Sequence, residues 1–212
     1  MGKKPNWAGL PLWWIRQNGL VDTFNAKQNI GEKIAALKCL ISITILIDFT
    51  TKKVRISQAK LEEFTKLSHP MVIKGLKFLQ SEGLILINTE DKPYEYYVKE
   101  DMEKSNWAKL PKPIALKEFS VISNRGRKNL HAIRLYIYFL SIRLSNSNIA
   151  RVSYQTIISK LKMSPNDVKS AIDILLNHSL ISIDNAYQDA DFDFKKNPPN
   201  RYRIKGLWER EI

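Results

Sequence analysis

The sequence predicts an α+β protein, mainly α, made of two copies of a small unit that holds three helices and a β-hairpin. The first observation is an internal repeat: residues 57–87 and 153–183 align without a gap at an offset of 96, and eight of the 31 aligned pairs are identical. The second is helical spacing of apolar residues, and the third is a strand pattern after the last helix of each copy. The identical pairs are Ser57 and Ser153, Lys66 and Lys162, Ser68 and Ser164, Val72 and Val168, Leu79 and Leu175, Leu84 and Leu180, Ile85 and Ile181, and Ile87 and Ile183.

A shorter repeat extends each unit towards its N-terminus. Residues 6–11 read Asn-Trp-Ala-Gly-Leu-Pro, and residues 106–111 read Asn-Trp-Ala-Lys-Leu-Pro, at an offset of 100. We therefore expect two domains, residues 1–104 and residues 105–212, each long enough for a modest core. The proline stops a helix from running through either stretch. Both are expected to be lead-in segments whose Trp7 and Trp107 pack on their domains, with stacking on nucleic-acid bases as the alternative.

The first helix of each unit is expected over residues 30–48 and 128–144. The first of these stretches is rich in Ile and Thr and could be a strand on its own. The second resolves the ambiguity, because its apolar residues recur at helical spacing. Lys38 aligns with Arg134 at the 96 offset. Each is interpreted either as a phosphate contact or as a snorkelling side chain, and the second interpretation is preferred.

Two more helices follow in each unit, and their start signals are serines that can accept a hydrogen bond from free backbone N–H groups. Proline stands in the first turn of the last helix in both copies, where its missing N–H costs nothing. The last helix of the first unit is expected to end at Gly83, and Ser179 takes that place in the second. The four candidate N-caps are Ser57, Ser68, Ser153 and Ser164.

A hairpin is expected after each helix pair. In the first unit the strands cover residues 84–87 and 94–99, and in the second they cover 180–184 and 201–205. The loop between the second pair, residues 185–200, is much longer. It begins acidic and ends basic.

The charge of the chain predicts an anionic partner. The 212 residues contain 34 Lys and Arg against 21 Asp and Glu, which gives a net charge of +13 and a pI near 9.7. The N-terminal half has a net charge of +4 and the C-terminal half, from residue 105, of +9. Nucleic acid is the commonest partner of such a chain, and a soluble basic protein without one is the alternative.

Other bulk features predict a soluble cytoplasmic protein without a membrane partner. The N-terminus has no apolar signal-peptide region, and the most apolar run, residues 39–47, is far shorter than the ~20 residues that span a bilayer. The single cysteine, Cys39, excludes an intramolecular disulfide and is expected to be a buried thiol.

Three helices followed by a two-stranded hairpin is the winged helix-turn-helix arrangement. Residues 68–85 resemble the recognition helix and first wing strand of bacterial winged-helix regulators, with a Ser cap, a Val, two Leu and then Glu-x-Gly-Leu-Ile. Two tandem winged helix-turn-helix domains resemble the plan of plasmid replication initiators. The resemblance implies sequence-specific binding of double-stranded DNA at repeated origin sequences, and a protein associated with the bacterial nucleoid.

In such domains the second helix of the helix-turn-helix enters the major groove with its N-terminal side chains at the base edges. With Val72, Leu76 and Leu79 in the core, the groove-facing candidates of the first unit include two lysines for phosphate or guanine and two apolar side chains for thymine methyl groups. These candidates are His69, Met71, Ile73, Lys74 and Lys77.

The second unit differs at the same place. Asn166 suits adenine, Lys169 suits phosphate or guanine, and Ser170 is polar, whereas Asp167 and Asp173 oppose close contact with phosphates. The two domains are therefore not expected to read the same sequence.

Three further basic segments are DNA-binding candidates. One is the tip of the first wing, one is the segment before the first helix of the second unit, and one is the second wing; a solvated linker and a disordered loop are the alternatives for the last two. Their residues are Lys92; Arg125, Arg127 and Lys128; and Lys195, Lys196, Arg201 and Arg203.

No catalytic residue is assigned, because the three histidines lie on separate elements and the chain has no glycine-rich phosphate loop. We expect no enzyme activity, cofactor or metal. The expected function is sequence-specific binding of double-stranded DNA, as an origin-binding replication initiator of a plasmid, phage or other mobile element. The alternatives are a transcriptional regulator with the same binding mode and a tandem winged-helix protein-interaction scaffold. A homodimer or proteins of replication or transcription are the further partners expected.

Overall fold

The structure is a computed structural model that describes residues 5–48, 50–100, 107–184 and 199–207. Within these ranges the predicted fold class, α+β and mainly α, is confirmed: eight helices accompany three small antiparallel sheets. None of the helices in these ranges combines the length and apolarity needed to cross a membrane.

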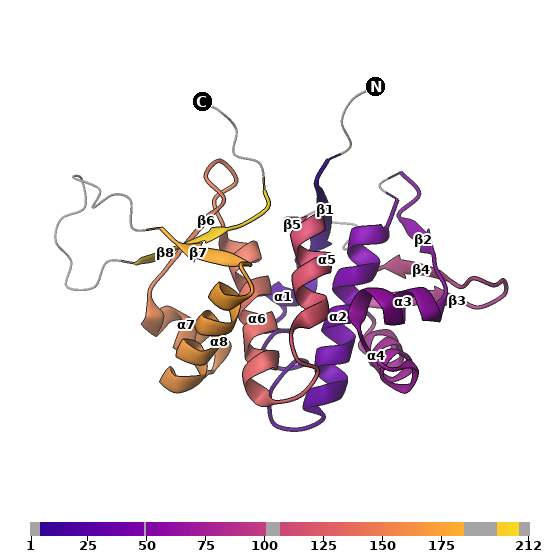
Figure 1. Cartoon of the computed structure of the whole chain (residues 1–212), viewed down its shortest axis with the longest axis horizontal. Helices are drawn as coiled ribbons and strands as arrows, with labels where there is room; N and C mark the ends of the chain where they lie inside the picture. The colour runs from indigo at the N-terminus through magenta and orange to yellow at the C-terminus, as the bar shows by residue number, and fades with distance from the viewer. Residues whose placement is uncertain (1–4, 49, 101–106, 185–198, 208–212) are drawn as a thin grey trace.

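The same order of elements occurs twice along the chain (Figure 1). The first unit consists of β1 (Trp7–Pro11), α1 (Trp13–Arg16), α2 (Ile30–Leu46), β2 (Lys53–Arg55), α3 (Gln58–Thr65), α4 (His69–Ser81), β3 (Ile85–Asn88) and β4 (Glu95–Val98). The second consists of β5 (Trp107–Pro111), α5 (Lys112–Val121), α6 (Arg127–Ile142), β6 (Ile149–Val152), α7 (Tyr154–Leu161), α8 (Pro165–Asn177), β7 (Ile181–Ile183) and β8 (Asn200–Ile204).

The three predicted helices of each unit are confirmed, with their start and stop signals. Three of the four serines accept a hydrogen bond from the backbone N–H three residues on, whereas Ser68 occupies the cap position without a side-chain bond. After α4, Gly83 adopts a φ of +66°, and after α8 Ser179 adopts +52°. The second unit thus makes the same left-handed turn with a residue that favours it less.

Each predicted hairpin is part of a three-stranded sheet, which corrects the expectation of two strands. The strand orders are β2-β4-β3 and β6-β8-β7, with the last strand of each unit in the middle. Strands β2 and β6 are only three and four residues long. Their partners, β4 and β8, lie some 40 to 50 residues further on, so local sequence gives little sign of them.

The two lead-in segments are strands that pair with each other. Strands β1 and β5 form an antiparallel ladder in which Gly9 lies opposite Lys109, its equivalent at the 100 offset. The rings of Trp7 and Trp107 stack with their centroids 4.9 Å apart. Each Trp therefore packs on the other unit's Trp, which corrects the expectation that it packs only on its own domain.

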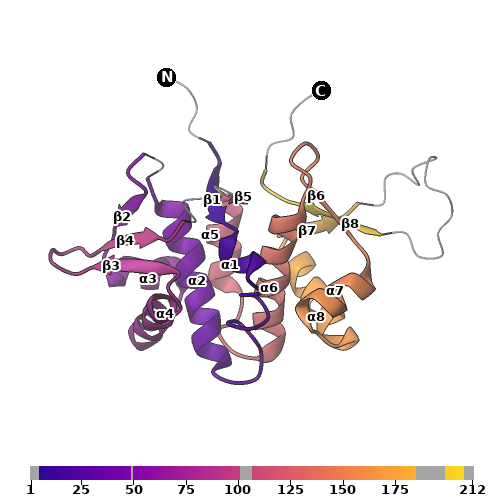
Figure 2. The same ribbon diagram turned by 180° about the vertical axis from the view of Figure 1, so that it is seen from behind.

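Helices α2 and α6 lie side by side at the centre of the molecule, and the other elements of each unit extend outwards from them (Figures 1 and 2). A turn of 180° about the vertical axis brings the second unit to the side of the view that the first unit occupied. Their apolar side chains form one continuous buried cluster. The predicted division between residues 104 and 105 falls outside the described residues and stays a prediction.

Helix α4 crosses α2 at Gly75, where the two backbones are in close approach. A Cβ atom there would lie 2.8 Å from the carbonyl carbon of Ala35 and 2.9 Å from the nitrogen of Ala36. The equivalent position in α8 is Ala171, which is fully buried.

Gly75→Ala is therefore expected to lower the free energy of unfolding by about 1–3 kcal/mol through overpacking. In a helix without this close approach, the same substitution would stabilise the protein by about 1 kcal/mol. The sign of the change in unfolding free energy therefore distinguishes overpacking from helix propensity. Urea unfolding measures it, with Ala171→Gly as the matched change in α8. A midpoint equal to or above that of the wild type would contradict the close approach.

Candidate nucleic-acid interface

Helix α4 turns one face to α2 and the opposite face to solvent. Val72, Leu76 and Leu79 are buried, as predicted. On the outer face Lys74 and Lys77 are exposed and lie about one turn apart. The sequence therefore folds locally into a helix that buries its apolar stripe and presents two lysine side chains to solvent.

The other three candidates on α4 differ in their surroundings. His69 is exposed, and its Nδ1 lies 2.6 Å from Oε1 of Glu62. Ile73 is half-buried between the two faces. Met71 is half-buried, packs against the core and lies near Gly31 at the start of α2; its predicted contact with a base stays a prediction.

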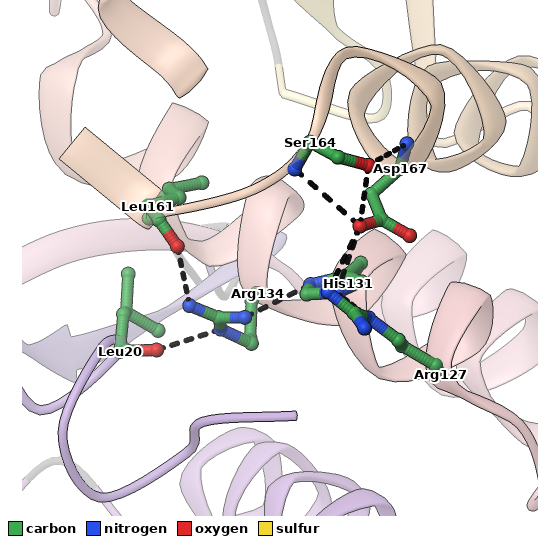
Figure 3. Close-up of polar contacts among 7 residues, drawn as sticks. All are labelled: Leu20, Arg127, His131, Arg134, Leu161, Ser164 and Asp167. Carbon is green, nitrogen blue, oxygen red and sulfur yellow. Dashed lines mark hydrogen bonds and ion pairs between the residues drawn. The ribbon is translucent and has the colours of Figure 1, made fainter. Parts of the chain in front are cut away.

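On α8, the side chains of Asn166 and Lys169 are exposed and that of Ser170 is half-buried. Asp167 does not face outwards as expected. Its carboxylate accepts a 2.7 Å hydrogen bond from the Ser164 hydroxyl and lies 3.1 Å from Nη2 of Arg127 on α6 (Figure 3). The capping box at the start of α8 accounts for this acidic residue, so Asp167 is not a free charge on the outer face.

The pKa of Asp167 reflects this position. Partial burial raises it, but the hydrogen bonds from Ser164 and the nearby cationic groups together outweigh burial and hold the pKa below its usual value. The carboxylate is thus ionised at neutral pH and pairs with Arg127.

The basic segment of Arg125, Arg127 and Lys128 lies between the turn before α4 and the first turn of α8. On one side Nδ2 of Asn124 donates a 3.0 Å hydrogen bond to the carbonyl of Lys66, in the turn before α4. On the other side Arg127 contacts Asp167 in the first turn of α8. All three basic side chains are exposed. The structure therefore joins three separately predicted segments along one edge of the molecule, the lower edge in Figure 1.

The hairpins project away from this central pair of helices. Lys92 is exposed at the tip of the first hairpin. In the second sheet, Arg201 and Arg203 are half-buried and both approach Oδ2 of Asp184, at 3.6 and 2.9 Å. These two arginines are thus engaged within the protein, and Lys195 and Lys196 lie outside the described residues.

Lys38 and Arg134 do not behave as the sequence suggested. Their exposed fractions are 1% and 2%, and their charged groups donate to backbone carbonyls inside the protein. Both the phosphate-contact and the snorkelling interpretations are wrong, because neither head group reaches water.

His131 on α6 is a buried polar residue that sequence reasoning did not single out. Its Nε2 accepts a 3.1 Å hydrogen bond from Nε of Arg127, and its Nδ1 lies 2.9 Å from Nη1 of Arg134 (Figure 3). Burial, and after it the charge of Arg134, lower the pKa of His131 to about 4. Two guanidinium groups on one ring keep that imidazole neutral.

Between pH 6.5 and pH 4 the unfolded chain therefore binds a proton at His131 that the folded chain does not, so folding stability falls as the pH is lowered through this window. The expected loss is about 3 kcal/mol at pH 4 relative to pH 7. Chemical unfolding of wild type and His131→Gln at both pH values measures it, with the half-buried His178→Gln as control. Equal losses in wild type and His131→Gln would contradict the assignment.

No protein-family model matches the chain, and a comparison with curated proteins finds no match either.

Proposed function

We propose that the chain is a sequence-specific double-stranded DNA-binding protein composed of two tandem winged helix-turn-helix domains. The order helix, strand, helix, helix, strand, strand, which occurs twice, supports this proposal. In it α4 and α8 are the recognition helices, and the hairpins β3–β4 and β7–β8 are the wings.

The observation that carries the proposal is a basic edge, formed by exposed lysine and arginine side chains of α4, of α8 and of the segment between them. Its members are Lys74 and Lys77 on α4, Arg125 and Lys128, and Lys169 on α8. Contacts of Asn124 and Arg127 hold the segment between the helices against the turn before α4 and the first turn of α8. The chain as a whole carries a net charge of +13. Such an edge suits the phosphates of a duplex, while the outer faces of α4 and α8 supply side chains for base edges.

The relation between the units suggests how the site on DNA is organised. The antiparallel β1–β5 ladder, with equivalent residues opposite each other, and the central pair α2 and α6 are what an approximate two-fold axis produces. Two reading units related in this way suit two half-sites in inverted orientation, about one helical turn apart. An origin-binding replication initiator of a mobile element, acting in the bacterial cytoplasm at the nucleoid, is the role we propose. A transcriptional regulator would use the same contacts.

Selection of bound duplexes from a random pool tests the proposal, followed by titration of affinity against salt. A two-part motif spanning about one turn is the expected result, with a log–log salt slope that reports the phosphates contacted. The absence of any bound duplex at low salt would refute DNA binding.

A protein-binding role for the second unit is the one alternative with an observation in its favour. At the 96 offset, Ser170 stands where the first unit has Lys74, and Asp173 where it has Lys77. Asp173 is exposed on α8. A selected motif with a single specific half would support this scaffold role.

A further inference from the structure

Two buried cations connect the units at equivalent places. Lys38 lies on α2 and Arg134 on α6, at the 96 offset that aligns the repeat. Lys38 donates to the carbonyl at the end of α3, and Arg134 to the carbonyl at the end of α7, each within its own unit. Each also donates to the segment before the central helix of the other unit. The two sets of contacts are therefore reciprocal, as the approximate two-fold axis requires.

The contacts of Lys38 fix the basic segment against the first unit. Its Nζ lies 2.6 Å from the carbonyl of Ile122, 2.6 Å from Oδ1 of Asn124, and 3.4 Å from the carbonyls of Thr65 and Ser120. Thr65 ends α3, four residues before α4 begins. One ammonium group thus ties the turn before α4 to the loop that leads to Arg125, Arg127 and Lys128.

The contacts of Arg134 make the opposite connection (Figure 3). Its Nε donates a 2.6 Å hydrogen bond to the carbonyl of Leu20, from the first unit, and its Nη2 a 2.8 Å bond to the carbonyl of Leu161. Leu161 ends α7, four residues before α8 begins, and aligns with Thr65. The turn before α8 is thereby held to the first unit.

Buried charges of this kind constrain geometry more than they add stability. Removing a charged group from water carries a large penalty, which only close and complete hydrogen bonding offsets, so a small displacement of either unit is unfavourable. An apolar interface would tolerate sliding more readily, because dispersion contacts have little direction. The position of α4 relative to α8 is thus defined by the carbonyl groups that each cation requires.

We propose that Lys38 and Arg134 are positioning residues that fix the spacing between the two DNA half-sites the protein accepts. The inference rests on the proposed DNA binding and explains why the protein would accept only one spacing between the two half-sites. Inserting one base pair between half-sites rotates them by roughly 34° and separates them by about 3.4 Å. Units held rigidly by these cations cannot follow that movement, whereas units joined only by the β1–β5 ladder and apolar contacts can follow it further.

The test measures the affinity of the full chain for the selected duplex and for duplexes whose central spacer is one base pair shorter or longer. Wild type is expected to lose roughly tenfold or more in affinity, the effect of about one lost base-pair contact. Lys38→Met and Arg134→Met should reduce that discrimination to about threefold or less, with affinity for an isolated half-site unchanged. Arg134→Lys should retain discrimination, because a lysine serves the equivalent place in α2. Lys117→Met, which removes an exposed charge from α5, is the control.

Asn124→Ala provides a milder variant if an apolar replacement does not fold, since it removes one Lys38 contact and the bond to Lys66 but leaves the carbonyl partners. It should give partial loss of discrimination. Full wild-type discrimination in every folded variant would overturn the inference and leave the proposed function intact. Failure of the wild type to bind any duplex would instead refute the proposed function.

Discussion

Replacement of both Lys74 and Lys77 by alanine is expected to weaken binding of the selected duplex by roughly 30-fold or more, about 2 kcal/mol. The two side chains lie about one turn apart on the outer face of α4, exposed to solvent. Their backbone positions are fixed by the buried Val72, Leu76 and Leu79 and by the close crossing at Gly75. Alanine favours the helix, so the double variant should keep its fold while losing two positive charges.

The salt dependence separates two ways in which these lysines can act. Two phosphate contacts would reduce the log–log salt slope by about 1.8, whereas two base contacts would leave the slope nearly unchanged and relax the preference at particular base pairs. Lys99→Ala with Lys117→Ala is the matched control, because both lysines are exposed and neither lies on α4. Equal affinities of the Lys74/Lys77 variant and wild type would exclude α4 from the interface.

The helix ends could be predicted from the sequence, because the residues that start and stop a helix lie next to it. The caps at Ser57, Ser153 and Ser164 and the left-handed residues Gly83 and Ser179 act within a few residues of themselves, and all five occur at the expected places. The repeat strengthened these expectations, since one copy resolved what the other left ambiguous, as it did for the central helix α2.

What the sequence could not predict depends on distant partners. Met71 and Asp167 occupy equivalent positions in α4 and α8, near the boundary between the buried and exposed faces, where helical spacing alone does not decide orientation. In the structure both turn towards the start of the central helix of their own unit, near Gly31 and Arg127 respectively. Gly31 and Arg127 are themselves equivalent at the 96 offset, so the same packing holds a methionine in one unit and an ion pair in the other.

The burial of Lys38 and Arg134 was not predicted, for a related reason. Lys38 and Arg134 each interrupt an apolar helix, and a lone cation in such a helix usually extends to water. Here the carbonyl partners come from both units. One of them, the carbonyl of Leu20, lies 114 residues from Arg134 in the sequence. Part of each cation's set of partners is supplied by the other unit, and the pairing of the units has no local sequence signal.

Reversal of one half-site is expected to reduce affinity more than any single side-chain change, by roughly 100-fold, to the level of a duplex with one half-site alone. The reason is the approximate two-fold relation between the units. The β1–β5 ladder places Gly9 opposite Lys109, and Lys38 and Arg134 make reciprocal contacts across the same centre. As the proposed recognition helices, α4 and α8 would approach the two grooves in opposite directions along the duplex.

The measurement compares the selected duplex with one in which the second half-site has the same sequence and spacing but the reverse orientation. Because the outer faces of α4 and α8 carry different residues, the two halves are expected to differ in sequence, and each must be reversed in turn. A duplex whose second half-site is replaced by an unrelated sequence gives the affinity of one half-site alone and serves as the control. Equal affinity for inverted and direct arrangements would mean that the units reorient on DNA, which the reciprocal burial of Lys38 and Arg134 argues against.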